Sequence, residues 1–239
     1  MYPFDELWQE ANQATFESYE RLEGIHYDAF LPLYQKYDRH FWEQYDLGHI
    51  TLDELRRLRL IETLKHDDID VTHEEAQVYF ERFFSLLLSK ITVNEKMNAL
   101  LDELKEYVVI AILTNGKLSE QKTKIDHLQL ETIFKDYIFI SEALGVEKPD
   151  PQAFLKVADT LNIRPEETVM VGNSWMNDVK GGLNVGMSAI WFNPPHETEQ
   201  YTENHQLQIF NGKIEQLLEK LITHMNGTES FSNDSFKQE

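Results

Sequence analysis

The sequence predicts an α/β fold in which a parallel sheet follows an all-helical N-terminal segment. The first observation is the uneven spread of helix breakers: residues 1–90 hold two glycines and two prolines, whereas the rest of the chain holds eight and five. The second observation is that short, β-branched apolar runs alternate with helical periodicity only after residue 90. Strands that alternate with helices imply βαβ crossovers, and such crossovers build a parallel sheet.

The helical segment is expected to begin with two amphipathic helices. Apolar side chains recur at helical spacing from Phe4 onward, and Gly24 can end this first helix. Asp28 can cap a second helix, because Pro32 is tolerable near a first turn. The second helix carries the aromatic residues Tyr34, Tyr37, Phe41, Trp42 and Tyr45.

Two further helices are predicted from capping boxes. Thr51 with Glu54, and Thr72 with Glu75, have the spacing at which a threonine hydroxyl and a glutamate satisfy each other's backbone amides. No convincing strand is expected before residue 90. The sequence therefore predicts four helices in a first domain, residues 1–90.

The second domain, residues 91–225, is expected to hold the sheet. The apolar run at residues 108–113 has the pattern of a strand that is buried on both faces. Further strands are expected at residues 137–141, 168–172 and 188–192. Helices are expected at residues 119–128, from Pro151 onward, at 178–185 and at 214–223. Residues 226–239, rich in Ser, Asn and Glu, are expected to be a disordered tail.

Composition and charge exclude several classes of function. The chain has 239 residues with 42 acidic and 22 basic side chains, a formal net charge of −20, which repels phosphate backbones and anionic lipid. We therefore expect neither nucleic acid nor membrane as a partner, and no particular protein partner is indicated. Cysteine is absent, which excludes disulfides and thiolate chemistry. No apolar run approaches a membrane span, and the N-terminus does not have the pattern of a signal peptide, so a cytoplasmic location is expected.

Candidate functional residues follow the predicted strands, because ligands of open parallel sheets bind at the carboxyl ends of the strands. Thr114, Asn115 and Gly116 follow the first strand and suit a phosphate or another oxyanion, although a helix cap and turn explains them equally well. Lys148, restricted by the proline after it, can neutralise a bound anion or can simply be a solvated surface lysine.

The third predicted strand is followed by Asn173 and Asp178. An amide and a carboxylate in one loop can supply oxygen ligands for magnesium, which is a hard cation. The alternative is that Asp178 only caps the helix that follows, a common use of aspartate. Each of these signals is weak alone, and their order and spacing together carry more weight.

These segments together resemble the haloacid dehalogenase-like (HAD) hydrolase superfamily. Leu-Thr-Asn-Gly at 113–116, Lys-Pro-Asp-Pro at 148–151 and Gly-Asn-Ser-x-x-x-Asp at 172–178 resemble its second, third and fourth motifs, in order. The resemblance covers roughly residues 1–224 and implies a Rossmann-like parallel sheet core with an N-terminal α-helical cap. Within the superfamily the chain looks most similar to phosphatases that act on small metabolites, including nucleoside monophosphates.

The resemblance also implies roles for the strand-end residues. Thr114 would hydrogen-bond the transferring phosphoryl group, and Asn115 and Gly116 would help to hold it. Lys148 would steady the negative charge of the nucleophile and the phosphate. Positioning and charge stabilisation of this kind supply most of the catalysis in phosphoryl transfer.

The metal role would fall to Asp178 together with Asn173, which would bind Mg²⁺. Asn173 stands where this family more often has an acid. Its carbonyl oxygen can be a ligand but brings no charge, so a lower metal affinity is expected.

The family's first motif, Asp-x-Asp-x-Thr, has no counterpart in this chain. It carries the nucleophilic aspartate at the end of a buried first strand. Residues 4–7 are only superficially similar, because the three residues before them cannot form a strand and Asp5 fits the start of a helix. We therefore expect the first core strand to be absent and the nucleophile to lie upstream of Met1. The missing strand would leave a gap between the strands that precede Thr114 and Asn173, with exposed apolar edges.

Three functions remain open from the sequence. The main expectation is a Mg²⁺-dependent phosphomonoesterase acting on small phosphorylated metabolites or nucleotides. It would act through an aspartyl-phosphate whose nucleophile lies upstream of Met1, so that the N-terminus is truncated. The second is a 2-haloacid dehalogenase-type hydrolase, and the third is an inactive relic that acts as a binding module. Aromatic residues of the helical segment can stack on a nucleobase, but we expect them to form its core instead.

Overall fold

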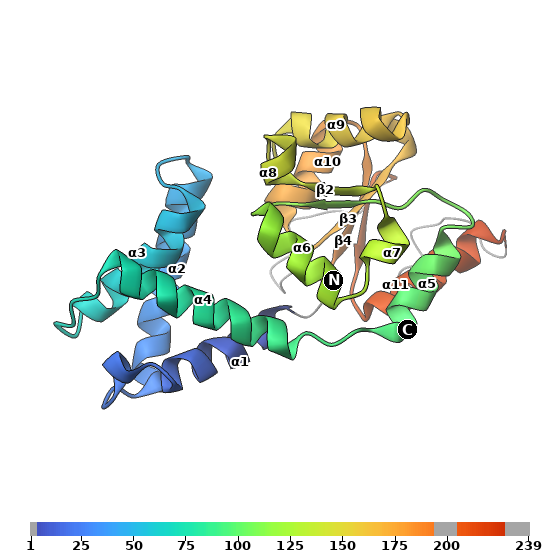
Figure 1. The fold of residues 1–239 in the computed structure, drawn as a ribbon. Coiled ribbons are helices and arrows are strands. Elements are labelled where there is room, and N and C mark those ends of the chain that lie inside the picture. Colours follow the sequence, from blue (N-terminus) through green and yellow to red (C-terminus); the bar gives the residue numbers. More distant parts are fainter. Residues whose placement is uncertain (1–3, 194–204, 228–239) are drawn as a thin grey trace. The chain divides into compact units, whose positions relative to one another are not determined.

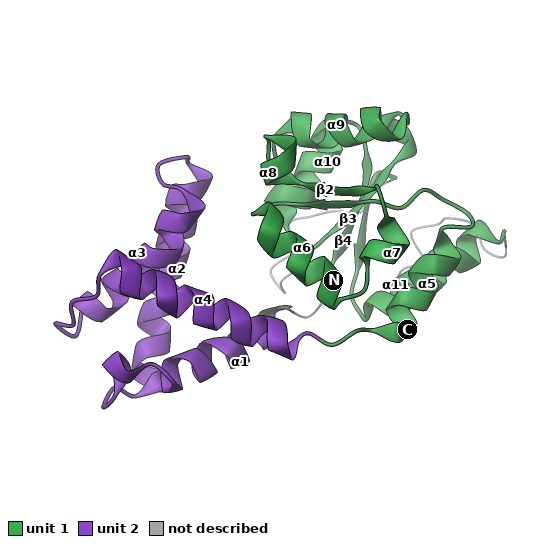
Figure 2. Cartoon of the chain, viewed as in Figure 1, with its two compact units in different colours: residues 1–2, 92–239 green, residues 3–91 purple. Residues whose placement is uncertain are grey.

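The computed structural model describes residues 4–193 and 205–227, and it divides the chain into two compact units (Figure 2). One unit is Pro3–Ile91, and the other comprises Met1–Tyr2 with Thr92–Glu239. Within the described residues no helix is both long enough and apolar enough to cross a bilayer.

The first unit is made of four helices and a short 3₁₀ turn (Figure 1). In chain order these are α1 Phe4–Glu17, the turn Glu20–Leu22, α2 Tyr27–Asp46, α3 Leu52–Lys65 and α4 His73–Lys90. Helix α2 packs on α3, α3 packs on α4, and α4 packs on α1. The four predicted helices are confirmed, and residues 4–91 of the described chain hold no strand.

Both predicted capping boxes are present. The Thr51 hydroxyl accepts the Glu54 amide at 3.2 Å, and the Glu54 carboxylate accepts the Thr51 amide at 2.8 Å. Thr72 and Glu75 repeat the arrangement at the start of α4. Hydrogen bonding by the capped backbone lowers the pKa of both glutamates. These helix starts could be predicted from the sequence, because the threonine and glutamate that bond each other's backbone amides lie only three residues apart.

Two helix boundaries differ from the prediction. Helix α1 ends at Glu17, ahead of Gly24, because the chain turns into the 3₁₀ segment that starts at Glu20. Helix α2 begins at Tyr27 with His26 as the residue before it, so Asp28 lies inside the first turn. A carboxylate in a first turn still favours the helix through its dipole.

The core of the helical unit is aromatic. Phe16 packs on Phe30 with ring centroids 4.8 Å apart, and Phe30 stacks on Tyr34 at 5.2 Å. Trp8 and Tyr19 pack at the border of the same cluster. The expectation that aromatic residues form this core thus holds for these side chains. Trp42 differs, because it is 42% exposed and contacts the Tyr45 ring at 5.6 Å.

A buried polar group gives this unit a predicted alkaline sensitivity. Burial raises the pKa of Tyr34 to about 12, although the nearby Arg59 opposes the shift. In the unfolded chain the Tyr34 hydroxyl deprotonates near pH 10. The contribution of the protonated hydroxyl to folding stability is therefore complete below pH 10 and is lost as the pH rises towards 12. We expect a loss of about 2 kcal/mol over that interval, measured as urea midpoints at successive pH values.

The matched variants for this measurement lie on the same helix. Tyr34→Phe removes the titrating hydroxyl and should make the alkaline decline shallower. Tyr37→Phe, at a half-buried ring that stacks on Phe41, is the control. An equally steep decline in Tyr34→Phe and the parent chain would contradict the prediction.

The described residues of the second unit form five parallel strands in two separate sheets. Strand β1 Ile112–Thr114 pairs with β2 Ile138–Ile140, with Leu113 opposite Phe139. Strands β3 Val169–Gly172, β4 Ser188–Phe192 and β5 Leu207–Phe210 form the other sheet, in that order. The predicted fold class, a parallel α/β core with an N-terminal helical segment, is therefore confirmed.

Helices complete the second unit (Figure 1). In chain order they are α5 Glu95–Leu104, α6 Leu118–His127, α7 Glu131–Phe134, α8 Ser141–Leu144, α9 Pro151–Leu161, a 3₁₀ turn Pro165–Glu167, a π-helix Trp175–Lys180, α10 Gly181–Asn184 and α11 Ile214–Met225. Helices α5 and α11 lie side by side, and an ion pair joins Lys96 to Glu219 at 2.7 Å.

The core of this unit lies on both faces of β4. Ile190 and Phe192 pack with Leu217 of α11, whereas Ala189 and Trp191 pack with residues of the π-helix on the opposite face. Successive side chains of a strand point to opposite faces, so a central parallel strand reads as an uninterrupted apolar run. That explains why residues 188–192 were recognisable as a strand.

The first predicted strand is wrong in its extent and burial. Strand β1 covers only residues 112–114, and Val109 is 57% exposed. The amides of Tyr107 and Val108 bond back to the Leu104 carbonyl, so they extend the end of α5 and cannot begin a strand. The β1 side chains are only half-buried, since no described strand pairs with its second edge.

Other parts of the second unit also differ from the sequence-based expectation. Strand β5 was missed, and the helix expected at 178–185 is divided into the π-helix and α10, which begins at the glycine pair 181–182. Gly181 lies so close to Phe154 that a Cβ would be 2.5 Å from that ring, which allows α10 to pack tightly on α9. In the expected tail, residues 228–239 lie outside the described part of the chain.

Candidate functional site

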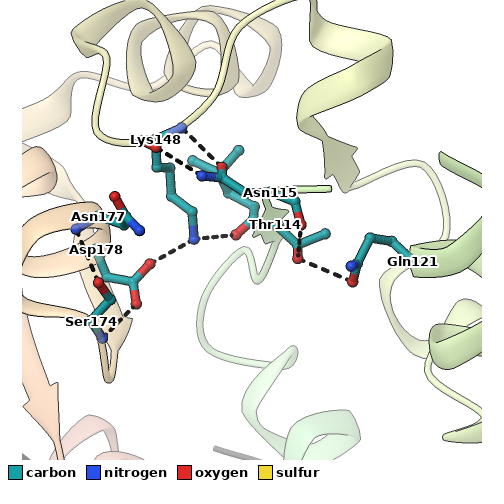
Figure 3. A network of polar contacts seen from close by, with 8 residues as sticks. Thr114, Asn115, Gln121, Lys148, Ser174, Asn177 and Asp178 are labelled. Carbon is teal, nitrogen blue, oxygen red and sulfur yellow. Dashed lines mark hydrogen bonds and ion pairs between the residues drawn. The ribbon is translucent and has the colours of Figure 1, made fainter. Parts of the chain in front are cut away.

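Four of the residues that the sequence singled out, Thr114, Asn115, Lys148 and Asp178, come together at the carboxyl ends of β1 and β3 (Figure 3). Thr114 is the last residue of β1, with Asn115 and Gly116 directly after it. Lys148 lies in the loop between α8 and α9. Asp178 belongs to the π-helix that begins three residues after β3. Parallel strands bring their carboxyl ends to one edge, which is why segments distant in sequence meet here.

Lys148 links strand β1 to the π-helix that follows strand β3. Its ammonium donates to the Asp178 Oδ1 atom at 2.6 Å and to the Leu113 carbonyl of β1 at 2.9 Å. The side chains of Lys148 and Asp178 are only 10% and 9% exposed. The hypothesis of a freely solvated surface lysine is therefore wrong for Lys148. A lysine has three ammonium donors, and these two bonds use two of them.

Asn115 holds the backbone of Lys148 from both sides. Its Nδ2 donates to the Lys148 carbonyl at 2.7 Å, and its Oδ1 accepts the Lys148 amide at 2.9 Å. The carboxamide therefore faces the lysine loop. From the sequence, Asn115 was expected to help hold a phosphate. That prediction could not include this contact, because 33 residues separate the two partners.

The loop after β1 has further polar supports that sequence reasoning missed. The Gly116 amide donates to the hydroxyl of Ser141 at 2.9 Å, and Ser141 is itself buried. The Thr114 hydroxyl lies 3.3 Å from Oε1 of Gln121, one turn into α6. The position of Ser141 at the end of a predicted strand was the available signal, whereas nothing in the sequence pointed to Gln121.

Asp178 is held by the backbone as well as by the lysine. Its Oδ2 accepts the Ser174 amide at 3.0 Å, and the Ser174 hydroxyl accepts the Asn177 amide at 3.1 Å. Gly172 makes this possible, because a Cβ there would overlap the Cβ, Cγ and Oδ2 atoms of Asp178. The alternative of a simple helix cap does not describe Asp178, since the capping side chain is that of Ser174.

The donor set for a metal consists of one carboxylate and neutral amides. Asn173 is exposed, and its backbone carbonyl accepts the indole N–H of Trp191 at 3.1 Å. Within the described residues no group of three or more acidic or histidine side chains could hold an ion. Mg²⁺ commonly keeps several waters and uses one or two carboxylates with a substrate phosphate, so Asp178 fits it as a single ligand.

The fold and this edge define a class of protein. It is a parallel α/β protein in which hydroxyl, ammonium and carboxylate groups meet at the carboxyl ends of β1 and β3, an arrangement suited to binding an anion. A family model for haloacid dehalogenase-like hydrolases matches residues 4–186. The chain belongs to this family, and the resemblance inferred from the three motifs is confirmed.

Curated relatives include phosphatases and nucleotidases. The N-acylneuraminate-9-phosphatase of Rattus norvegicus is 36% identical over 110 residues, which is 46% of this chain and 44% of the relative. The pyrimidine 5'-nucleotidase PynA of Streptococcus pneumoniae is 28% identical over 201 residues, 83% of this chain and 78% of the relative. The chain thus matches less than half the length of the rat phosphatase.

Solved structures share the fold. The putative HAD-hydrolase YfnB from Bacillus subtilis, bound to magnesium, has a TM-score of 0.71 at 22% identity, covering 94% of this chain and 93% of that one. The defluorinating L-2-haloacid dehalogenase Rha0230 has a TM-score of 0.64 at 22% identity, covering 90% and 89%. At these identities the likeness supports the fold and leaves the reaction open.

Proposed function

We propose that the protein is a Mg²⁺-dependent phosphomonoesterase acting on small phosphorylated metabolites, nucleoside monophosphates among them. The observation that carries the proposal is the convergence of Thr114, Lys148 and Asp178 at one edge of the sheets. A hydroxyl, a buried ammonium and a carboxylate are the groups needed to position a phosphoryl group and offset its charge. The phosphatases and the nucleotidase among its relatives support the same class of substrate.

Each residue has a distinct part in this proposal. Thr114 donates its hydroxyl to a phosphoryl oxygen, and the backbone of Asn115 and Gly116, directly after it, helps to hold the phosphoryl group. Lys148 uses its third ammonium donor for the anion, since the other two already bind Leu113 and Asp178. Asp178 would hold Mg²⁺, with Asn173 beside it, and the metal would neutralise charge on the phosphate.

The nucleophile of this proposal is an aspartate at the end of a further strand, which would pair between β1 and β3 and is not among the described residues. The division of the sheet between β1 and β3 supports it. The Ile112 amide bonds to the Tyr137 carbonyl, so by alternation the Leu113 carbonyl faces the edge of β1 away from β2. Val169 on β3 is 47% exposed. A strand between these edges would bury both.

The proposed reaction has two steps. A carboxylate oxygen of the aspartate forms a bond to phosphorus while the bond to the ester oxygen breaks, and the leaving alkoxide takes up a proton. Water then attacks the aspartyl-phosphate, which releases inorganic phosphate and restores the carboxylate. Lys148 offsets the charge in both steps. We propose that the helical unit acts as a cap that selects the substrate, in a cytoplasmic enzyme with neither nucleic acid nor membrane as a partner.

The test is hydrolysis of p-nitrophenyl phosphate and of nucleoside monophosphates by the protein extended upstream, with Mg²⁺ and with EDTA. We expect turnover with Mg²⁺ that EDTA abolishes. Lys148→Met should remove turnover, whereas Lys180→Met, which deletes an exposed charge two residues from Asp178, should keep it. Turnover that persists in EDTA would contradict metal dependence.

Two other functions have their own observations. A 2-haloacid dehalogenase is favoured by Asn173, a neutral residue in the metal loop, and by an ion pair between Lys148 and Asp178 that needs no metal. Chloride release from a 2-chloro acid in EDTA would identify it. A binding module is favoured by the open sheet, and it predicts that phosphate or Mg²⁺ raises the melting temperature of the chain without any turnover.

A further inference from the structure

The position of the Lys148 ammonium depends on a closed set of contacts. Starting at β1, the Leu113 carbonyl accepts the ammonium, and two residues later the Asn115 side chain holds the backbone of the same lysine. The lysine is therefore attached to the end of β1 at both of its ends. A lysine side chain has four flexible methylenes, so an ammonium can be aimed only when its backbone is also fixed.

We propose that Asn115 is a positioning residue that acts through Lys148 and that its side chain is not a phosphate ligand. The Oδ1 and Nδ2 atoms of Asn115 both bond to Lys148, at 2.9 and 2.7 Å. The carboxamide thus faces the lysine backbone, where it can set the direction from which the ammonium approaches Asp178. The proposal concerns the geometry of Lys148, and only its second test rests on the proposed function.

The chain contains a matched control for this contact. Asn193 directly follows β4, as Asn115 directly follows β1. Its Oδ1 accepts the Gly212 amide at 2.7 Å, and its Nδ2 donates to the Gly212 carbonyl at 2.9 Å. Asn193→Ala therefore removes the same two kinds of bond as Asn115→Ala, from a backbone segment that does not include Lys148.

The first test measures how well Lys148 is protected. Reductive methylation of the folded chain, followed by peptide mass spectrometry, gives a modification rate for each lysine, and exposed Lys180 serves as the internal reference. We expect Lys148, 10% exposed in its side chain, to react at least five-fold faster in Asn115→Ala and at the parent rate in Asn193→Ala. An unchanged Lys148 rate in Asn115→Ala, or an equal rise in Asn193→Ala, would overturn the proposal.

A second variant covers the case in which Asn115→Ala does not fold. Asn115→Asp keeps an oxygen that can accept the Lys148 amide but loses the donor to the Lys148 carbonyl. Its Lys148 rate should lie between those of the parent chain and Asn115→Ala. Full protection of Lys148 in a folded Asn115→Asp chain would count against a role for the donor half of the contact.

The second test separates action through Lys148 from direct contact with an anion. Calorimetric titration with inorganic phosphate should show about ten-fold weaker binding for Asn115→Ala, and no further weakening when that change is added to Lys148→Met. Equal weakening in both backgrounds would make Asn115 a phosphate ligand and overturn the proposal. If neither the parent chain nor the protein extended upstream binds phosphate, the proposed function fails, while the methylation rates still decide the role of Asn115.

Discussion

Replacing Asp178 by alanine is expected to lower the free energy of unfolding by about 3 kcal/mol. The change leaves the Lys148 ammonium, in a side chain 10% exposed, without its counter-charge, and it removes the acceptor of the Ser174 amide. Breaking a buried pair by deleting one partner is costly, because the remaining charge stays buried and uncompensated. Urea denaturation, followed by tryptophan fluorescence, measures the loss.

Two comparisons show whether burial causes this loss. The Asp102–Lys105 pair has a similar distance, 2.8 Å, but Asp102 is 67% exposed, so Asp102→Ala should have little effect. The double change Asp178→Ala with Lys148→Met should recover part of the stability, since no unpaired charge remains. Equal losses for Asp178→Ala and Asp102→Ala would show that the Lys148–Asp178 pair is effectively solvated.

The second large effect is expected at Gly172. Gly172→Ala should cost about 2 kcal/mol of stability, because its new Cβ would overlap three atoms of Asp178 and push the carboxylate out of place. The displaced carboxylate could no longer accept both the Lys148 ammonium and the Ser174 amide. The same measurement of urea midpoints applies, and the Lys148 methylation rate should rise together with the loss.

A double-mutant cycle tests this steric explanation. Asp178→Gly removes the three Asp178 atoms that lie within 2.4 Å of the new Cβ. Gly172→Ala should therefore cost much less in the Asp178→Gly background than in the parent chain. An identical cost in both backgrounds would place the conflict elsewhere, in the backbone of the β3–π-helix turn.

The helical starts and the central strand show how far local pattern goes. Thr51 and Thr72 were predictable as caps because their partners lie three residues away. Residues 188–192 were predictable as a strand because both of their faces are buried. Strand β1 was overextended, since the sequence cannot show that the amides of Tyr107 and Val108 already bond to the end of α5.

The candidate site was predictable in its members more than in their contacts. Thr114, Lys148 and Asp178 follow strands in the expected order, and the structure brings them to one edge. Ser141 and Gln121 were missed because their neighbours on the loop after β1 are set by the packing of α8 and α6. Neither a single serine nor a single glutamine carries a periodic signal of such a contact.

The sequence by itself determined the fold class, the family and the chemical groups at the strand ends, because hydrophobic period, capping and short motifs are written in neighbouring residues. Only the tertiary structure decided that Lys148 pairs with Asp178 and that Asn115 holds the lysine backbone. These partners are 30 and 33 residues apart, and their contact depends on how separate strands and loops pack. The gap between β1 and β3 was expected from the missing first motif, whereas the pairing partners of the described strands are a long-range property that no local pattern encodes.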